Sequence, residues 1–294
     1  MKNKLSILFL LIFALGFAQT STLKKEIKQI IKGKNATVAV SVLDFENNKS
    51  IDINGNKKLP MLSVFKFHIA LAVLNQVDEG KLSLDQNIFI KKSELLLNTW
   101  SPIREKYPEG NIEMPLNELI KYTVAQSDNN GCDILLKLIG GTGTVQSFIN
   151  SNGIKDFQIK ADEEKMHQGY EFMYWNWTTT NASNTLLKKL FDGKVVSKKS
   201  TDFLMKTLIE TTTGVTKIVA QLPKGTPVAH KTGSSGKDKN GLTIAENDIG
   251  IITLPNGKHY AISVLVSDSM ESEETNTKTI ADISKIVFDY FSKK

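Results

Sequence analysis

The chain has 294 residues, a formal net charge of +6 and a single cysteine. One cysteine excludes an internal disulfide, so stability must come from packing. The excess of lysine is spread along the chain without an arginine-rich or aromatic-interleaved block, which argues against a nucleic-acid partner. Four histidines, His68, His167, His230 and His259, lie far apart and match no metal-binding spacing. We therefore expect neither a metal nor any other cofactor.

The first eighteen residues, "MKNKLSILFLLIFALGFA", join a basic start to an uncharged apolar run that ends in small residues. This pattern predicts a secretory signal peptide over residues 1–18, with cleavage after Ala18. A membrane anchor is the alternative, but the run is short for a span and no second apolar stretch approaches its length. The residue directly after the cleavage site is not a cysteine, so a lipid anchor is not indicated. We expect an exported protein, periplasmic or secreted, that is monomeric and has no stable membrane anchor.

The mature chain, residues 19–294, is long enough to bury a substantial core as a single domain. Apolar residues at helical spacing predict a short amphipathic helix over residues 22–33. Apolar and β-branched runs over residues 36–45 and 49–55 then flank "ENN", which is typical of a β-hairpin.

The middle of the chain, from Pro60 to about Phe203, has mostly helical patterns. A proline suited to a first turn begins "PLNELIKYTVAQ", and glycines end "CDILLKLIGG" and "TNASNTLLKKLFDG". From Pro227 onward strands return in "PVAHKTGSSG" and "NDIGIITLPNGKHYAISVLVSD", where Asn256 and Gly257 supply a turn. A final helix, "NTKTIADISKIVFDYFS", closes the chain.

Two strands near the start and three near the end are each too few for a stable sheet, but together they make five that helices can cover. We therefore expect an α+β fold with a five-stranded antiparallel sheet flanked by helices. Both chain ends, about residues 19–59 and 207–294, would build this subdomain. An all-α subdomain, about residues 60–206, would be inserted between them. The cleft where the two join is the expected ligand site.

The segment "PMLSVFKFHIALAVLNQ", residues 60–76, reads as a buried helix with two polar side chains near its start. Ser63 and Lys66 are three residues apart, so a hydroxyl and an amine can meet on one helix face. A buried lysine must find a partner or lose its charge. A nucleophile beside its base is one interpretation. An N-cap serine with a lysine that reaches the surface is the other.

Two further motifs favour the first interpretation. S-x-x-K alone is weak, because it also occurs at Ser21 and Ser234, whereas "SDN" (residues 127–129) and "KTG" (residues 231–233) each occur once. Each tripeptide alone would more often be a turn. Together they follow Ser63 in the order S-x-x-K, S-D-N, K-T-G, which is found in penicillin-recognising serine enzymes.

With these motifs the sequence resembles the class A serine β-lactamases. The resemblance extends over essentially the whole mature chain and includes "TWSPI", "SDNNGCDIL", "LPKGTPVAHKTGSSG" and the hairpin around "LPNG". These longer strings are similar to a divergent branch of class A whose members include extended-spectrum enzymes.

The resemblance implies a role for each motif residue. Ser63 would be the acylated nucleophile and Lys66 its proton partner. Ser127 would relay a proton to the leaving lactam nitrogen, and Asn129 would bind the side-chain amide of the substrate.

The K-T-G motif would bind the other end of the substrate. By the resemblance, Lys231 and Thr232 would hold the substrate carboxylate. Burial and a nearby cation such as Lys231 can lower the pKa of Lys66, which a base for Ser63 requires. The developing oxyanion needs preorganised donors, and the backbone N–H groups of Ser63 and Ser234 could provide them.

Hydrolysis of an acyl-serine also needs a carboxylate that activates water. The family places it in an Ω-shaped loop, usually as E-x-x-L-N, whereas this chain has "EEKMHQ". Matching Met166 to the leucine and His167 to the asparagine puts the carboxylate at Glu163 rather than Glu164. His167 would then orient the water by a hydrogen bond. A solvated loop is the alternative for two adjacent glutamates.

Two residues are predicted to line the cleft more peripherally. Trp100 would form a wall of its mouth, and ordinary packing is the alternative. Lys217 falls where the family can carry an extra cation for the substrate carboxylate, and an exposed lysine at a helix end is the alternative.

The sequence thus predicts an exported serine β-lactamase that hydrolyses penicillins or cephalosporins through an acyl-enzyme and confers antibiotic resistance. A cell-wall D,D-peptidase of the same fold shares all three motifs and would lack the deacylating carboxylate. A drug-sensing receptor domain that is acylated and signals is a third reading, but it would be expected to carry a transmembrane segment after the cleaved signal.

Overall fold

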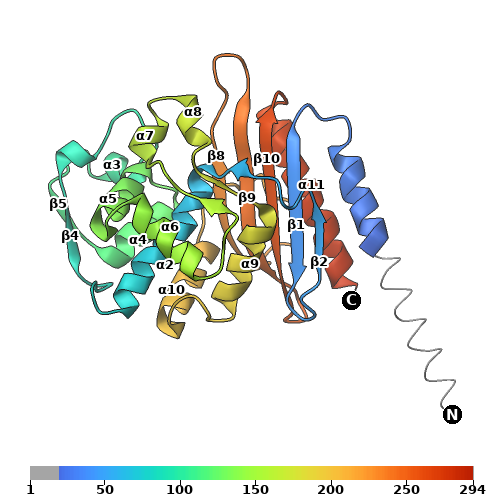
Figure 1. Cartoon of the computed structure of the whole chain (residues 1–294), viewed down its shortest axis with the longest axis horizontal. Coiled ribbons are helices and arrows are strands. Elements are labelled where there is room, and N and C mark those ends of the chain that lie inside the picture. Colours follow the sequence, from blue (N-terminus) through green and yellow to red (C-terminus); the bar gives the residue numbers. More distant parts are fainter. Residues whose placement is uncertain (1–19, 294) are drawn as a thin grey trace, which may run out of the picture.

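A five-stranded antiparallel sheet lies at the centre of the structure, a computed structural model that describes residues 20–293 (Figure 1). The predicted signal peptide lies outside the described residues. The strand order is β2-β1-β10-β9-β8, so strands from the two chain ends lie side by side. The strands are β1 (Thr37–Asp44), β2 (Ser50–Ile53), β8 (Val228–Ser234), β9 (Thr243–Thr253) and β10 (His259–Ser269). The predicted α+β fold with a sheet built from both ends is confirmed.

Alternation along β1 shows why the sheet is covered on both faces. Successive side chains of a strand point to opposite faces. Val40 lies opposite Val264 of β10 and belongs to one core cluster, whereas its neighbour Ala39 lies opposite Leu265 and belongs to the other. Each face therefore needs its own layer of helices.

The outer face is covered by segments from the two ends of the chain. A helix over residues 20–31 places Leu23 and Ile27 in the same cluster as Ile280 and Val287 of α11 (Glu273–Ser292). In Figure 1 both helices lie on the side of the sheet away from the helical middle of the chain. The predicted N-terminal helix is confirmed, and a left-handed glycine, Gly33, follows it.

The inner face packs against the middle of the chain, with α2 as the central helix. Phe67 and Leu71 of α2 are fully buried in one cluster with Ala261 and Leu265 of β10. The helices of the middle are α2 (Phe65–Asp78), α3 (Pro102–Lys106), α4 (Leu116–Ala125), α5 (Asn129–Ile139), α6 (Thr142–Ser151), α7 (Glu163–Met166), α8 (Tyr170–Met173), α9 (Thr180–Phe191) and α10 (Lys198–Ile209). Two 3-10 turns, η1 (Leu62–Val64) and η2 (Lys92–Glu94), complete them. The inner face of the sheet and the helical middle therefore share one core cluster.

The middle is mainly helical, as expected for the inserted subdomain, and it also contains short strands. Short strands in the loops between the helices pair with one another, because buried backbone N–H and C=O groups need hydrogen-bond partners. They are β4 (Asn87–Ile90) with β5 (Ile112–Pro115), and β3 (Leu59–Pro60) with β7 (Trp177–Thr178) and β6 (Phe157–Gln158). The subdomain boundaries near residues 60 and 206 stay a prediction.

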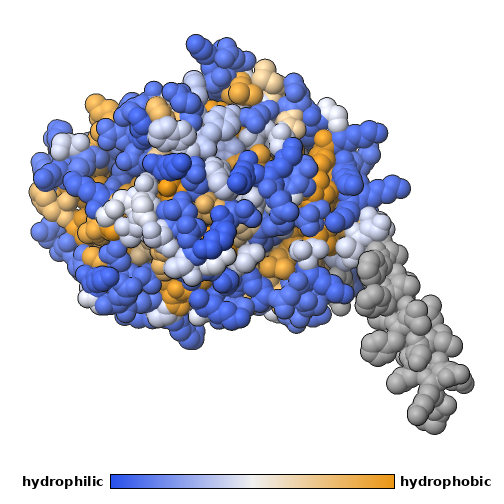
Figure 2. Space-filling view, in the orientation of Figure 1, coloured by the Kyte–Doolittle hydropathy of each residue, from blue (hydrophilic) through white to orange (hydrophobic). Residues whose placement is uncertain are grey.

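The face in Figure 2 is largely hydrophilic, with small hydrophobic areas scattered over it. Within residues 20–293, no helix combines the length and the apolar character that crossing a bilayer requires.

Candidate active site

Ser63 lies in the 3-10 turn η1, which leads directly into α2. Lys66 follows one turn later, and its Nζ donates to Ser63 Oγ at 2.7 Å. Lys66 is fully buried among apolar neighbours on α2. The three-residue spacing therefore brings the hydroxyl and the amine together, and Lys66 does not extend to the surface.

The serine turn is held by the sheet. Asn247 of β9 donates from Nδ2 to the carbonyls of Pro60 at 2.8 Å and Met61 at 3.1 Å. A Cβ on Gly233 of β8 would lie 2.4 Å from Met61 O and 3.1 Å from Ser63 N, so only glycine fits there. The K-T-G strand is thus in direct contact with the backbone of the serine turn.

Ser127 and Asp128 of the S-D-N motif lie between α4 and α5, where the predicted interruption of the helices is observed, and Asn129 begins α5. Asp128 is the N-cap of α5 and accepts from Gly131 N at 2.8 Å. Its carboxylate also accepts from Ile103 N at 2.7 Å and from Ser101 Oγ at 3.0 Å. Burial raises the pKa of Asp128, while these donors act in the opposite direction. Asp128 fixes Ser127, whose φ is +60°.

Lys66 connects the motifs to one another. Its Nζ donates to Ser127 O at 3.1 Å and to Asn129 Oδ1 at 2.5 Å. It also forms an ion pair with Glu163 Oε1 at 2.7 Å. The nucleophile, the S-D-N motif and the loop carboxylate therefore meet at one ammonium.

Lys231 occupies the other side of Ser127. Its Nζ donates to Ser127 Oγ and to Thr232 O, both at 2.9 Å. The side chain is 1% exposed, and burial, with the charges of Lys66 and Lys217, holds the pKa of Lys231 well below its usual range. An anion placed beside this amine would favour its charged form.

A cleft of about 350 Å³ opens between β8 and the helices. Most predicted residues of the site line it, namely Ser63, Trp100, Ser127, Asn129, Lys217, Thr232 and Ser234. The Trp100 side chain is 55% exposed, and its Nε1 donates to Gln126 O at 2.9 Å, so the ring lies on the cleft wall rather than in the core.

Lys217 is buried, so the alternative of an exposed lysine at a helix end is wrong. It is 4% exposed and forms an ion pair with Glu246 of β9. Its Nζ also donates to Ser234 Oγ at 3.0 Å. Sequence reasoning missed Glu246, because one glutamate in a strand carries no recognisable pattern.

A second hollow, of about 230 Å³, adjoins the cleft through Asn129. Glu163, Glu164 and His167 line it, and all three come from the α7 loop. The Glu163 side chain is buried against Lys66, whereas Glu164 is exposed. Of the two adjacent glutamates, Glu163 is therefore the one that contacts Lys66.

Asp133 of α5 holds the start of α7. Its two carboxylate oxygens accept from Glu163 N at 2.8 Å and Glu164 N at 2.9 Å. Burial, with the charge of Glu163, raises the pKa of Asp133 to about 7. Sequence reasoning also missed this residue, because its partners lie thirty positions away along the chain.

His167 has protein partners at both ring nitrogens. Nδ1 donates to Glu163 O at 2.7 Å, and Nε2 lies 3.2 Å from Thr99 Oγ1, which also accepts from Asn129 Nδ2 at 2.6 Å. The ring ties the α7 loop to Thr99 across the hollow, which it also lines. That His167 orients a water stays a prediction.

A serine hydroxyl on a buried ammonium, a second serine on another ammonium and a loop carboxylate within reach can carry out acyl transfer. Together with the sheet and helix arrangement, they define a serine acyl-transfer enzyme of the β-lactamase and transpeptidase type. The model of the family described as Beta-lactamase enzyme family matches residues 22–291, and the chain belongs to this family, within class A.

Named relatives agree with this assignment. Beta-lactamase VEB-1 of Pseudomonas aeruginosa is 47% identical over 297 residues, which cover 100% of this chain and 99% of that protein. Extended-spectrum beta-lactamase PER-1 of the same species is 42% identical over 94% of this chain and 90% of that protein.

Solved structures show the same fold. The crystal structure of the TLA-3 extended-spectrum beta-lactamase matches with a TM-score of 0.91 and 52% identity, covering 93% of this chain and 99% of that one. A class A beta-lactamase from Bacteroides cellulosilyticus matches with a TM-score of 0.90 and 41% identity, covering 94% and 99% of the two chains. The predicted family and fold are thus confirmed.

Proposed function

We propose that this class A β-lactamase hydrolyses penicillins or cephalosporins through an acyl-enzyme on Ser63, and so confers resistance to them. One observation carries the assignment of roles: the buried Lys66 ammonium contacts both Ser63 Oγ at 2.7 Å and Glu163 Oε1 at 2.7 Å. The nucleophile and a carboxylate for the water therefore share one proton carrier.

In acylation, Ser63 Oγ attacks the strained lactam carbonyl. Its proton passes to Lys66, which becomes able to accept it once Glu163 has taken a proton from the ammonium. The backbone N–H groups of Ser63 and Ser234 stabilise the oxyanion. Ser127, whose Oγ accepts from Lys231, gives its proton to the lactam nitrogen as the carbon–nitrogen bond breaks. Ser127 regains a proton from Lys66, and Lys66 recovers one from Glu163, so Glu163 is a carboxylate again before deacylation begins.

Substrate binding is assigned to the rest of the cleft. Lys231 and Thr232 take the substrate carboxylate, and Lys217 adds a further cation beside Ser234. Asn129 takes the side-chain amide, and Trp100 forms a wall of the mouth.

In deacylation, Glu163 removes a proton from a water in the second hollow, and that water attacks the acyl carbonyl. Ser63 is released and the ring-opened acid departs. The buried position of Glu163 against Lys66 favours hydrolysis over the D,D-peptidase alternative, in which no loop carboxylate would serve the acyl-enzyme.

The segment over residues 1–18 supports export of the protein to the periplasm or the medium as a monomer. Its cleavage after Ala18 would be visible in the mass of the protein recovered from the host.

Ser63→Ala should abolish covalent labelling by penicillin and turnover of a chromogenic cephalosporin, because no other hydroxyl contacts Lys66 Nζ in the described structure. Mass spectrometry and absorbance measure the two effects. Ser21→Ala, which removes the serine of another S-x-x-K string, should label and turn over like the wild type. A stable adduct on Ser63→Ala would remove Ser63 from its role. A single turnover by the wild type followed by silence would favour the peptidase.

A further inference from the structure

A buried glutamate, Glu246, lies in the part of the cleft proposed to receive the substrate carboxylate. It is paired with Ser234 across β9 and β8, so the two side chains project from the same face. Glu246 is 3% exposed and lines the cleft together with Lys217. A carboxylate in an anion site repels the anion unless a cation balances it.

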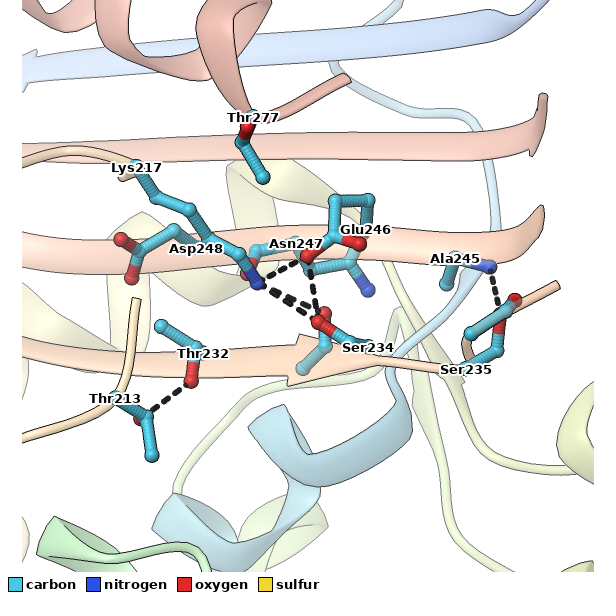
Figure 3. A network of polar contacts seen from close by, with 12 residues as sticks. Thr213, Lys217, Thr232, Ser234, Ser235, Ala245, Glu246, Asn247, Asp248 and Thr277 are labelled. Carbon is cyan, nitrogen blue, oxygen red and sulfur yellow. Dashed lines mark hydrogen bonds and ion pairs between the residues drawn. The ribbon is translucent and has the colours of Figure 1, made fainter. Parts of the chain in front are cut away.

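Glu246, Lys217 and Ser234 contact one another in a closed triangle (Figure 3). Lys217 forms an ion pair with Glu246 and donates to Ser234 Oγ at 3.0 Å. The Lys217 ammonium can only donate, so Ser234 Oγ accepts from it. The Ser234 hydroxyl then donates its own hydrogen to Glu246 Oε1 at 2.5 Å. The remaining acceptors of Lys217 are neutral carbonyls, Asn247 O at 3.2 Å and Gly233 O at 3.5 Å. Glu246 is thus the anion in contact with Lys217.

The other charges near Lys217 do not take the place of Glu246. Lys231 is a buried cation that interacts unfavourably with Lys217. Asp248 of β9 is engaged by His230 Nδ1 at 3.0 Å and by a backbone N–H at 3.2 Å.

A fourth charge comes from α11. Glu273 lines the same cleft, but it is exposed, and no ion pair to it occurs within the described part of the chain, residues 20–293. Exposed carboxylates are screened by water and salt, so Glu273 balances Lys217 weakly.

We propose that Glu246 is a positioning residue that keeps the Lys217 ammonium charged and directed toward the carboxylate subsite. The proposal rests on the function proposed above. Lys217 is buried beside a second lysine, and such an ammonium stays protonated when a carboxylate compensates it. When the substrate carboxylate arrives, it meets an ammonium that is already charged.

Removal of the carboxylate should make substrate recognition depend on pH. In Glu246→Gln the amide oxygen can still accept a hydrogen bond, but the ammonium loses its compensating charge and releases its proton at a lower pH. At low pH the uncompensated cation attracts the substrate carboxylate. At high pH Lys217 is neutral, and that attraction is lost.

The test is the kcat/KM of Glu246→Gln divided by that of the wild type, for a chromogenic cephalosporin that carries a carboxylate. Because the ratio is taken at each pH between about 6 and about 9, ionisations that the two enzymes share cancel. We expect the ratio to fall by at least about tenfold across this range. Above the pKa of a group, its protonated fraction falls about tenfold for each unit of pH.

Two controls separate this role from a merely structural one. Glu246→Gln in a Lys217→Arg background should give a ratio to Lys217→Arg that does not vary with pH, because a guanidinium keeps its proton. Glu273→Gln removes a carboxylate from the same cleft without touching Lys217, so its ratio to the wild type should also stay constant with pH.

The outcomes are distinct. Two results would overturn the proposal while normal turnover by the wild type leaves the function standing. One is a Glu246→Gln to wild-type ratio that does not vary with pH. The other is a ratio that falls by the same factor in the Lys217→Arg background. No turnover by the wild type would overturn the function itself. If Glu246→Gln does not fold, recovery of the fold in Lys217→Met/Glu246→Gln supports charge compensation, and failure of that double variant counts against it.

Discussion

Lys66 is the residue on which the proposed chemistry depends most. Its ammonium has three hydrogens, and Ser63 Oγ, Asn129 Oδ1 and Glu163 Oε1 all lie within 2.7 Å of Nζ. Any proton that leaves Ser63 therefore has a short route to Glu163. The same contact means that a change at Glu163 can affect acylation as well as deacylation.

Glu163→Gln should form the acyl-enzyme and then accumulate it, because the amide keeps the side chain's shape but cannot take a proton from water. Turnover should fall by about 10²–10⁴-fold, the usual contribution of a positioned general base. The deciding measurement is the adduct trapped after rapid quenching and detected by mass spectrometry. The overall rate decides less, because acylation can slow as well.

Glu164→Gln is the matched control, since it makes the same change one residue further along α7. Glu164 is exposed, so this variant should behave nearly as the wild type. Accumulation in Glu164→Gln but not in Glu163→Gln would shift the assignment by one residue. Accumulation in neither would place the carboxylate elsewhere.

At the residue scale, the sequence predicts the groups that lie in short motifs and misses those defined by distant contacts. Ser63 and Lys66 are three positions apart on one helix face, so their contact follows from helical geometry. Asp133 and Glu246 meet their partners only after α5 packs on α7 and β9 pairs with β8. The spacing of residues along the sequence cannot predict such contacts between distant elements.

At the scale of elements, α7 is a single turn that depends on its neighbour α5 for its position. Its first two backbone N–H groups donate to Asp133, and its N-cap, Asp162, accepts from Lys165 N at 2.8 Å. A helix of four residues has little stability of its own. The orientation of Glu163 therefore depends on the carboxylate of Asp133.

Asp133→Asn should slow deacylation by about tenfold to a hundredfold, because an amide offers one acceptor oxygen where two N–H groups need acceptors. Its NH₂ group would face the second N–H. The rise of the acyl-enzyme after mixing with penicillin, followed by mass spectrometry, measures the effect. Acylation itself should change less.

Asp133 should also give the wild type a pH dependence that Asp133→Asn lacks. Its pKa is raised from about 3.8 to about 7, so the folded protein holds this proton more tightly than the unfolded chain. The stability that this proton contributes is therefore lost as pH rises from about 3.8 to about 7, and the ionised carboxylate then supplies both acceptors. Deacylation should weaken as pH falls through about 7, and an equal inflection in Asp133→Asn would contradict this assignment.

Elements with a clear period were predicted well, and very short ones were not. The helix over residues 20–31 and the hairpin of β9 and β10 each show a regular apolar pattern. The two-residue strands β3, β6 and β7 are too short to show any period. They form because tertiary packing brings the loops together, so no local pattern in the sequence predicts them.

At the scale of the whole molecule, the site lies where the edge of the sheet meets the helical middle. β8 is an edge strand, and it carries Thr232 and Ser234 along one side of the cleft, while its Lys231 is buried. Ser63 comes from the opposite side, and Gly233 lets the two backbones touch. That the chain ends meet could be inferred from the number of strands alone, whereas this close approach could not.

The core that supports the nucleophile contains an ionisable group, His68 of α2. It is 1% exposed, stacks on Phe157 at 4.5 Å between ring centroids, and lies near Val64 O at 3.3 Å. Burial lowers its pKa from 6.5 to about 3. The unfolded chain therefore binds this proton more tightly, and stability is lost as pH falls from about 6.5 toward about 3.

His68→Phe should make the protein less sensitive to acid, because a phenyl ring can stack on Phe157 and has no proton to gain. Between pH 7 and about pH 5 the free energy of unfolding should fall by about 2 kcal/mol more in the wild type than in the variant. This figure follows because the His68 contribution is about 1.4 kcal/mol for each unit of pH below about 6.5. Urea unfolding of both proteins at the two pH values measures this difference, and the other titrating groups cancel because both proteins contain them. Equal losses in the two proteins would show that His68 is not the group that links protonation to unfolding of this core.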